Sequence, residues 1–234
     1  MIEIKGVTKK YGNKKAIDNV TFDVNDGEIF AFIGHNGAGK TTLIKAITGI
    51  HDFDEGEILL NNKSIKSDTI ACKKDMAFVP DNPEMYDNMT AINFINFICD
   101  MYEVSLEDRK SNIDKYAKMF EMDDKLGDTI KSFSHGMKQK VALIAALSHN
   151  PKILIMDEPF VGLDPKAVYD IKEVMHEMAK EGKTIIFSTH ILDVAEKLCS
   201  RVAIIKNGKL VKVGSMKDIK GDKTLENVFL ELEE

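Results

Sequence analysis

Residues 34–41 read GHNGAGKT, a spacing of glycine, lysine and threonine that fits a loop for binding phosphate groups. Glycines let the backbone curl until several N–H groups point inward at phosphate oxygens. A helix beginning near Lys40 adds its positive end to this cradle. We expect the Lys40 ammonium group to reach the β- and γ-phosphates of a nucleotide and the Thr41 hydroxyl to bind Mg²⁺. The residues expected around the nucleotide are Gly34, His35, Asn36, Gly37, Ala38, Gly39, Lys40, Thr41 and Thr42.

A chance match is the alternative explanation of this pattern, and the neighbouring segments argue against it. Residues 28–33 form an almost continuous apolar run, which predicts a strand buried on both faces in a parallel sheet. Residues 40–48 then predict a helix. The loop therefore lies between a strand and a helix, which is the context that phosphate binding by such a loop requires.

Two adjacent carboxylates follow a second apolar strand. Residues 153–156 read ILIM and are followed by Asp157 and Glu158. Ligands of open α/β sheets bind at the carboxyl ends of strands, so Asp157 is expected to support Mg²⁺, directly or through water. Glu158 points elsewhere and is expected to polarise an attacking water. The alternative is a strand end that carries two acidic surface residues.

The order of the predicted elements indicates an α/β protein whose core sheet is mostly parallel. Strands are expected at the N-terminus and at residues 56–60, 75–79, 152–156 and 184–188, with a hairpin over residues 201–213 turned at Asn207 and Gly208. Helices are expected at residues 165–180 and 192–198. Between the strands, three helices (from Thr90 to about residue 102, from Ser105 to about residue 122, and from near Gly136 to residue 148) predict an inserted helical lobe.

Composition narrows the class of protein. The 234 residues carry a formal net charge of -6, which argues against a nucleic-acid binder because such proteins usually present a basic face. Three widely spaced cysteines with no CxxC pair suit a reducing compartment. The N-terminus does not read as a signal peptide, and the longest apolar run, residues 141–147, is far shorter than the roughly 20 residues of a membrane span. A cytoplasmic chain is expected, with any membrane link made through a partner.

Residues 132–139, SFSHGMKQ, narrow the class further because they precede the Asp157–Glu158 strand and open a helix. The segment resembles the signature motif of ABC ATPases, usually Leu-Ser-Gly-Gly-Gln, with Ser134 and Gly136 retained. Taken alone, the stretch is only a helix N-cap; its order and position carry the resemblance, which extends over nearly the whole chain. The resemblance implies a P-loop NTPase core with an N-terminal antiparallel β subdomain (residues 1–84 and 151–234) and a helical signature subdomain (residues 85–150).

Four further positions resemble family motifs. Tyr11 is similar to the aromatic residue on which adenine stacks, and residues 161–164 (VGLD) to the D-loop. His190 resembles the switch histidine that touches the γ-phosphate, and Asp81 replaces the usual glutamine and is a candidate ligand of Mg²⁺ or water. The alternatives are a surface tyrosine beside a turn glycine, a turn that starts a helix, a structural histidine and a turn aspartate before Pro83.

The resemblance implies ATP and Mg²⁺ as cofactors, with Lys40, Glu158 and His190 as the catalytic residues. It also implies that Ser134 and Gly136 of one protomer close the ATP site of another, so a dimer is expected, most simply of two copies. The subtype resembled is the ABC-2 exporter, which uses a separate membrane permease and would place the chain at the inner face of the membrane. Candidate permease contacts are Met85, Tyr86 and Phe94, with packing in the core as the alternative for Phe94. The alternative function is a soluble ABC ATPase that acts on ribosomes or nucleic acid.

Overall fold

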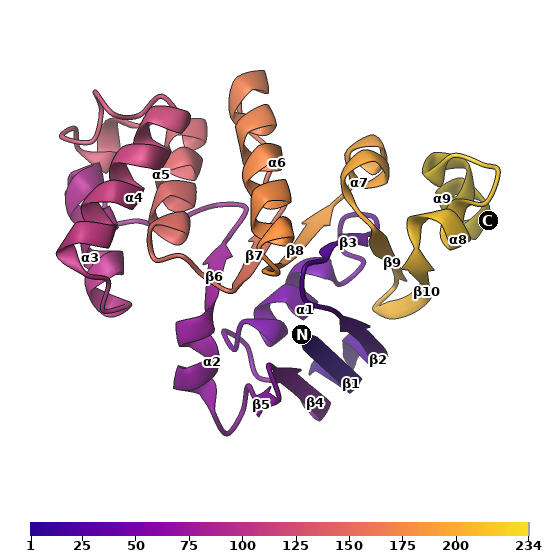
Figure 1. The fold of residues 1–234 in the computed structure, drawn as a ribbon. Helices are drawn as coiled ribbons and strands as arrows, with labels where there is room; N and C mark the ends of the chain where they lie inside the picture. Colours follow the sequence, from indigo (N-terminus) through magenta and orange to yellow (C-terminus); the bar gives the residue numbers. More distant parts are fainter. Residues whose placement is uncertain (234) are drawn as a thin grey trace.

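The computed structural model describes residues 1–233 and contains two β-sheets flanked by helices (Figure 1). The larger sheet has the strand order β10-β9-β3-β8-β7-β6 and is parallel except for β10, which pairs antiparallel with β9. Every residue of β3 and β7 is buried, as their continuous apolar runs predict. The strands are β3 (Ile29–Ile33), β6 (Met76–Val79), β7 (Ile153–Asp157), β8 (Thr184–Thr189), β9 (Arg201–Lys206) and β10 (Lys209–Ser215).

The smaller sheet is antiparallel and has the order β2-β1-β4-β5. Alternate residues such as Ile2 and Ile4 face its buried side, which follows from the period of two along a strand. Gly56 in β4 has φ 92°, and a Cβ there would lie 2.5 Å from the backbone oxygens of Lys5 and Gly6, so only glycine fits. The strands are β1 (Ile2–Tyr11), β2 (Lys14–Val24), β4 (Glu55–Leu60) and β5 (Lys63–Ser64).

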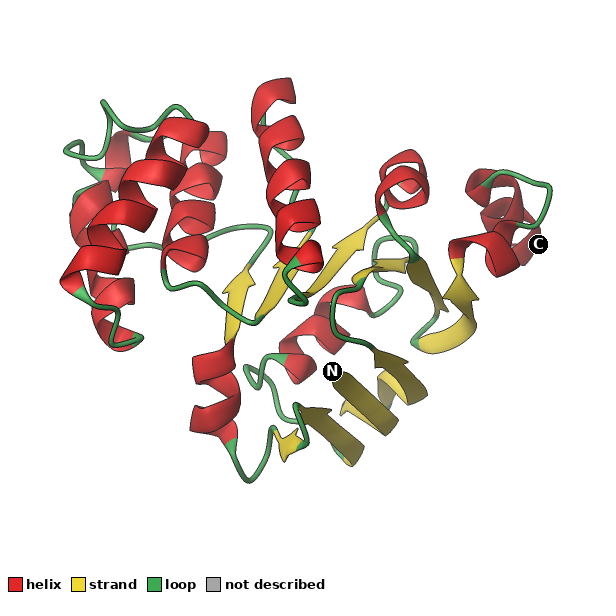
Figure 2. Cartoon of the chain, in the orientation of Figure 1, coloured by secondary structure: helices red, strands yellow, loops and turns green. Residues whose placement is uncertain are grey.

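Helix α1 (Lys40–Ile47) lies between the two sheets and shares a hydrophobic core with both of them (Figure 1). A second core lies on the opposite face of the large sheet, under further helices, which Figure 2 draws in red beside the yellow strands. Those helices are α3 (Ala91–Met101), α4 (Leu106–Met119), α5 (His135–Ser148), α6 (Pro165–Lys180) and α7 (Leu192–Leu198). The parallel sheet, the antiparallel sheet and the inserted helices confirm the predicted fold class.

Local capping accounts for where the inserted helices begin. The side-chain oxygens of Thr90, Ser105 and Ser134 accept hydrogen bonds from backbone N–H groups in the first turns of α3, α4 and α5. The helix α4 ends at Met119, three residues before the predicted end, because Glu121 takes a left-handed conformation with φ 56°. The boundaries proposed for the helical subdomain at residues 85 and 150 stay a prediction.

Three short helices and one 3₁₀ turn have no counterpart in the sequence prediction. They are α2 (Thr69–Asp75), the 3₁₀ turn Ile130–Ser132, α8 (Met216–Lys220) and α9 (Leu225–Glu233). Asp75 is the last residue of α2, whereas the predicted strand began at this residue. None of the helices among residues 1–233 has the length and apolar character needed to cross a bilayer.

Candidate active site

The loop between β3 and α1 is fixed by backbone contacts that only glycine permits. A Cβ on Gly34 would lie 2.4 Å from the carbonyl oxygen of Ile205, and a Cβ on Gly39 would lie 2.5 Å from that of Ala16. Gly39 also has φ 112°, in the left-handed region that glycine favours. The loop therefore sits directly on β9 of the large sheet and on β2 of the small one. Thr41 and Thr42 follow in the first turn of α1.

Lys40 is the first residue of α1 and is only 5% exposed. Its Nζ donates hydrogen bonds to the carbonyl oxygens of Gly34 (2.7 Å) and His35 (3.3 Å). The same Nζ lies 3.4 Å from Oε1 of Glu158. A buried ammonium group requires such partners. The structure thus brings together Lys40 and Glu158, which lie more than 100 positions apart in the sequence.

Asp157 and Glu158 leave the end of β7 in different directions. Asp157 is buried in the strand, whereas Glu158 takes a left-handed conformation with φ 47° that turns the chain out of the strand. Ser188 joins the two residues, since its hydroxyl donates to the Asp157 carboxylate and accepts the Glu158 N–H at 3.0 Å. Ser188 was not among the predicted site residues. The available signal was its place two residues before His190, at the end of the neighbouring parallel strand.

His190 follows β8 and faces Glu158. Its ring Nδ1 lies 2.9 Å from Oε2 of Glu158, and its backbone N–H donates to the same oxygen at 3.3 Å. The Glu158 carboxylate therefore touches Lys40 through one oxygen and His190 through the other. Residues expected to act together in the chemistry are adjacent in the structure.

Asp81 lies two residues after β6 and close to the other carboxylates. Partial desolvation raises the pKa of the Asp81 carboxyl, and the negative charges of Asp157 and Glu158 raise it further. Within residues 1–233, no three His, Cys, Asp or Glu side chains are grouped closely enough to hold a metal ion alone. The carboxylates of Asp157 and Asp81 are groups that could hold Mg²⁺, which binds through one or two carboxylates together with phosphate and water oxygens.

The signature segment lies against the loop that follows Glu158. A Cβ on Gly136 would lie 2.5 Å from the carbonyl oxygen of Gly162, and a Cβ on Gly162 would lie 2.6 Å from the ring of His135. Lys140 also forms an ion pair with Asp164 at 2.6 Å, and Asp164 caps α6. The segment resembling the signature and the segment resembling the D-loop therefore pack together within one chain.

A buried glutamine links the same helix to the loop that carries Asp81. Gln139 is fully buried in α5, and its Nε2 donates to the carbonyl oxygen of Pro80 at 3.2 Å. Gln139 and Asp164 belong to the segments identified in the sequence, residues 132–139 and 161–164, but their contacts with Pro80 and Lys140 were not predicted. The predicted adenine contact, Tyr11, ends β1, is 49% exposed and pairs its hydroxyl with Nδ1 of His51 at 3.0 Å. Its role stays a prediction.

A model of the family described as ABC transporter matches residues 17–161. The chain belongs to this family. An ABC transporter ATP-binding protein of Methanocaldococcus jannaschii is 36% identical over 218 residues, which are 93% of this chain and 79% of that protein. The ABC-type transporter ATP-binding protein EcsA of Bacillus subtilis is 33% identical over 237 residues, which are 99% of this chain and 96% of EcsA.

Solved structures of the ABC family give the same result. A structure described as the ATP-binding subunit of an ABC transporter aligns with a TM-score of 0.96 at 32% identity, covering 100% of both chains. A dimeric ATP-binding cassette in a post-hydrolysis state with ADP and Pi aligns with a TM-score of 0.84 at 26% identity, covering 92% of this chain and 99% of that one. This ABC chain is an ATPase subunit of a transporter, as predicted. The relatives give no support to the ribosomal or nucleic-acid alternative, and the ABC-2 subtype stays a prediction.

Replacing Ser188 with alanine removes the hydrogen bonds that hold Asp157 and the Glu158 backbone. We expect the turnover number for ATP to fall by about 10- to 100-fold, since a buried hydrogen bond to a charged group contributes about 1.5–3 kcal/mol. Thr184→Ala, which removes a hydroxyl from the other end of β8, is the matched control. The ATP turnover of both variants is measured as steady-state phosphate release. Turnover in Ser188→Ala equal to that of the control would contradict the assigned role.

Proposed function

We propose that this ABC subunit binds Mg-ATP on the loop of residues 34–42, hydrolyses it with Glu158, and thereby drives a separate membrane-spanning partner. The observation that carries the proposal is the contact of Lys40 and His190 with the two oxygens of the Glu158 carboxylate. Three chain segments supply these groups, and they meet at the carboxyl ends of β3, β7 and β8. Ligands of open α/β sheets bind at such an edge.

Lys40 is proposed to neutralise the β- and γ-phosphates. Its present partners are two neutral carbonyl oxygens and one carboxylate, and triphosphate oxygens compete with them for the same ammonium group. The inward-facing N–H groups of the glycine-rich loop then complete the cradle. Thr41 and Asp157 are the residues proposed to hold Mg²⁺, with Asp81 at its margin. The ion, when bound, neutralises charge that develops on the phosphate oxygens.

Glu158 is proposed to accept a proton from the attacking water. A carboxylate at a strand end, released from Lys40 when that group turns to the phosphates, is free to orient the water. His190 holds the second carboxylate oxygen of Glu158 and thereby fixes its direction, and it is also proposed to contact the γ-phosphate. Tyr11 is proposed to stack on the adenine base.

A second protomer is proposed to complete the ATP site. Ser134 caps α5 and Gly136 lies in its first turn, where the N-terminal end of the helix and the Ser134 hydroxyl favour an anion. Each chain has one phosphate-binding loop and one signature segment, so two chains are needed for each pair of closed sites. ATP held between two protomers binds the closed dimer better than the open monomer, and hydrolysis removes that preference.

Glu158→Gln is expected to trap an ATP-bound dimer, because the amide cannot accept the proton from water while ATP binding is retained. Size-exclusion chromatography with Mg-ATP should shift this variant from monomer to dimer, and omission of ATP should reverse the shift. Glu173→Gln, which neutralises an exposed carboxylate on α6, is the control and should behave as wild type. An unchanged monomer elution of Glu158→Gln with Mg-ATP would contradict dimer closure.

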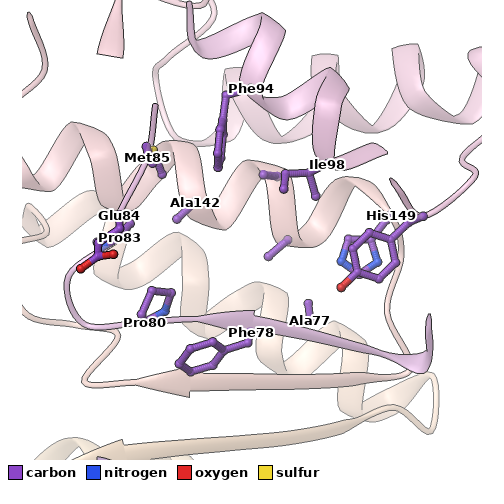
Figure 3. Close-up of a pocket in the computed structure, with 13 residues that line it drawn as sticks. Ala77, Phe78, Pro80, Pro83, Glu84, Met85, Phe94, Ile98, Ala142 and His149 are labelled. Carbon is purple, nitrogen blue, oxygen red and sulfur yellow. The ribbon is translucent and has the colours of Figure 1, made fainter. Parts of the chain in front are cut away.

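The membrane partner is proposed to dock in an apolar groove beside Asp81. The groove lies between the end of β6 and helices α3 and α5, and Figure 3 shows Pro80 and Phe78 on one side, with Met85, Phe94 and Ile98 on the other. At one end, His149 stacks on Tyr102 with ring centroids 3.6 Å apart, and burial lowers the pKa of His149 to about 4. The imidazole is therefore neutral at pH 7 and does not disturb an apolar contact. Docking here holds the chain at the cytoplasmic face of the membrane.

Met85→Glu places a charge in this groove and is expected to weaken docking. The tagged chain should be purified from its native membranes in mild detergent, and the proteins that come with it identified. Wild type and Tyr169→Glu, which charges an exposed position on α6, should retain a polytopic membrane protein. Met85→Glu should recover it at least about tenfold less well, because burying a charge against an apolar segment is costly. Ribosomal proteins in place of a membrane protein would contradict the transport proposal.

A further inference from the structure

The C-terminal helix α9 lies outside the segment matched by the family model, yet it packs beside the active site. It contacts α7, the helix that follows His190, and also α8 (Figure 1). Leu225, Val228 and Phe229 of α9 are buried. A helix of nine residues is not stable by itself in water, so these contacts account for its formation.

Polar contacts fix α9 at both ends. Near its start, the Leu225 N–H donates to Oε2 of Glu196 at 2.9 Å, and Glu196 in α7 also pairs with Lys220 of α8. Near its end, the carbonyl oxygen of Leu232 accepts a hydrogen bond from Nζ of Lys206 in β9 at 2.8 Å. The helix is thus attached to α7 on one side and to the large sheet on the other.

Between these attachments, α9 reaches the phosphate-binding loop. The ring of Phe229 meets the ring of His35 edge-on, with centroids 4.9 Å apart and planes at 63°. The two rings line a small cavity together with Asn36, His190 and Leu192. One aromatic side chain of the C-terminal helix therefore borders both the loop that binds phosphate and the segment that carries His190.

His35 is also one of the two residues whose carbonyl oxygens hold Lys40. A shift of the His35 backbone would change the position from which Lys40 must reach the phosphates and the direction of the neighbouring loop N–H groups. We propose that Phe229 is a positioning residue for nucleotide binding, because it packs against His35 and holds this part of the loop in the shape that accepts the triphosphate. The inference rests on the proposed ATP site.

Phe229 is expected to affect the binding of ATP and not its hydrolysis. Asp157, Glu158 and Ser188, which are proposed to act on Mg²⁺ and water, are held by β7 and β8 and receive no described contact from Phe229. His190 borders the same cavity as Phe229, but its ring and its backbone N–H are held by Glu158. Loss of the Phe229 ring should therefore raise the KM and the dissociation constant for ATP and leave kcat nearly unchanged. An aromatic pair of this kind corresponds to about a two- to tenfold change in affinity.

The test compares Phe229→Ala, Phe229→Leu and Phe229→Tyr with a control, Leu230→Ala, which truncates a 57% exposed neighbour on the same helix. ATP turnover is measured over a range of ATP concentrations, and thermal unfolding is followed for each variant. Phe229→Ala should raise KM by about two- to tenfold and keep kcat within about twofold of the control. Phe229→Leu should give an intermediate KM, and Phe229→Tyr, which keeps the ring, should restore the wild-type value.

A merely structural role for Phe229 predicts a different result. It would lower the melting temperature and the fraction of active protein, so kcat would fall while KM stayed that of the control, and this outcome would overturn the proposal. Should Phe229→Ala fail to fold, the difference in KM between the leucine and tyrosine variants decides the question, and equal values overturn the proposal. A wild-type chain that turns over no ATP would instead overturn the proposed site itself.

Discussion

Lys40 and Glu158 meet at the end of the large sheet with 3.4 Å between Nζ and Oε1, and most of the site is arranged around this pair. The pair joins the loop before α1 to the end of β7. Its charges are shielded from water, so each needs the other and the neighbouring donors and acceptors. Gly34 and His35 complete the surroundings of the lysine, and His190 completes those of the glutamate. Phosphate oxygens fit the same position because they offer the lysine stronger partners.

Close backbone contacts at glycines fix the positions of the segments that carry the site residues. Gly34 lies on Ile205 and Gly39 on Ala16, so the phosphate-binding loop is held by both sheets. Gly136 lies in the same way on Gly162, which attaches the inserted helices to the chain that follows Glu158. Gln139 adds a hydrogen bond to Pro80, next to Asp81, although its own Oε1 is buried without a described partner. Through these contacts, the segments that carry the carboxylates, the apolar groove and the signature residues are packed against one another.

The features that depend on neighbouring residues in the sequence could be predicted. The short apolar runs before Gly34 and Asp157 predict buried strands, and the glycines and capping residues mark where helices begin. The fold class and the phosphate-binding loop could therefore be predicted. Features that depend on a contact between distant segments could not. Ser188 is an ordinary strand residue until β8 pairs with β7 and places it opposite Asp157. Helix α9 has only nine residues. The Thr224 side chain accepts a hydrogen bond from the Asn227 N–H at its start, but one cap does not stabilise so short a helix. Its formation also depends on Glu196 and His35, which lie 29 or more positions away from their partners on the helix.

The most direct test of this account is the ATP turnover of Lys40→Ala beside Lys45→Ala, which removes a lysine from the same helix. Both purified variants should show the thermal unfolding of a folded chain before their turnover is compared. The account predicts that Lys45→Ala hydrolyses ATP like wild type, whereas turnover in Lys40→Ala falls by about 100-fold or more, the size of effect seen when a charge-stabilising donor is removed from an active site. Wild-type turnover in Lys40→Ala would contradict the account, because the group at its centre would then have no part in the reaction.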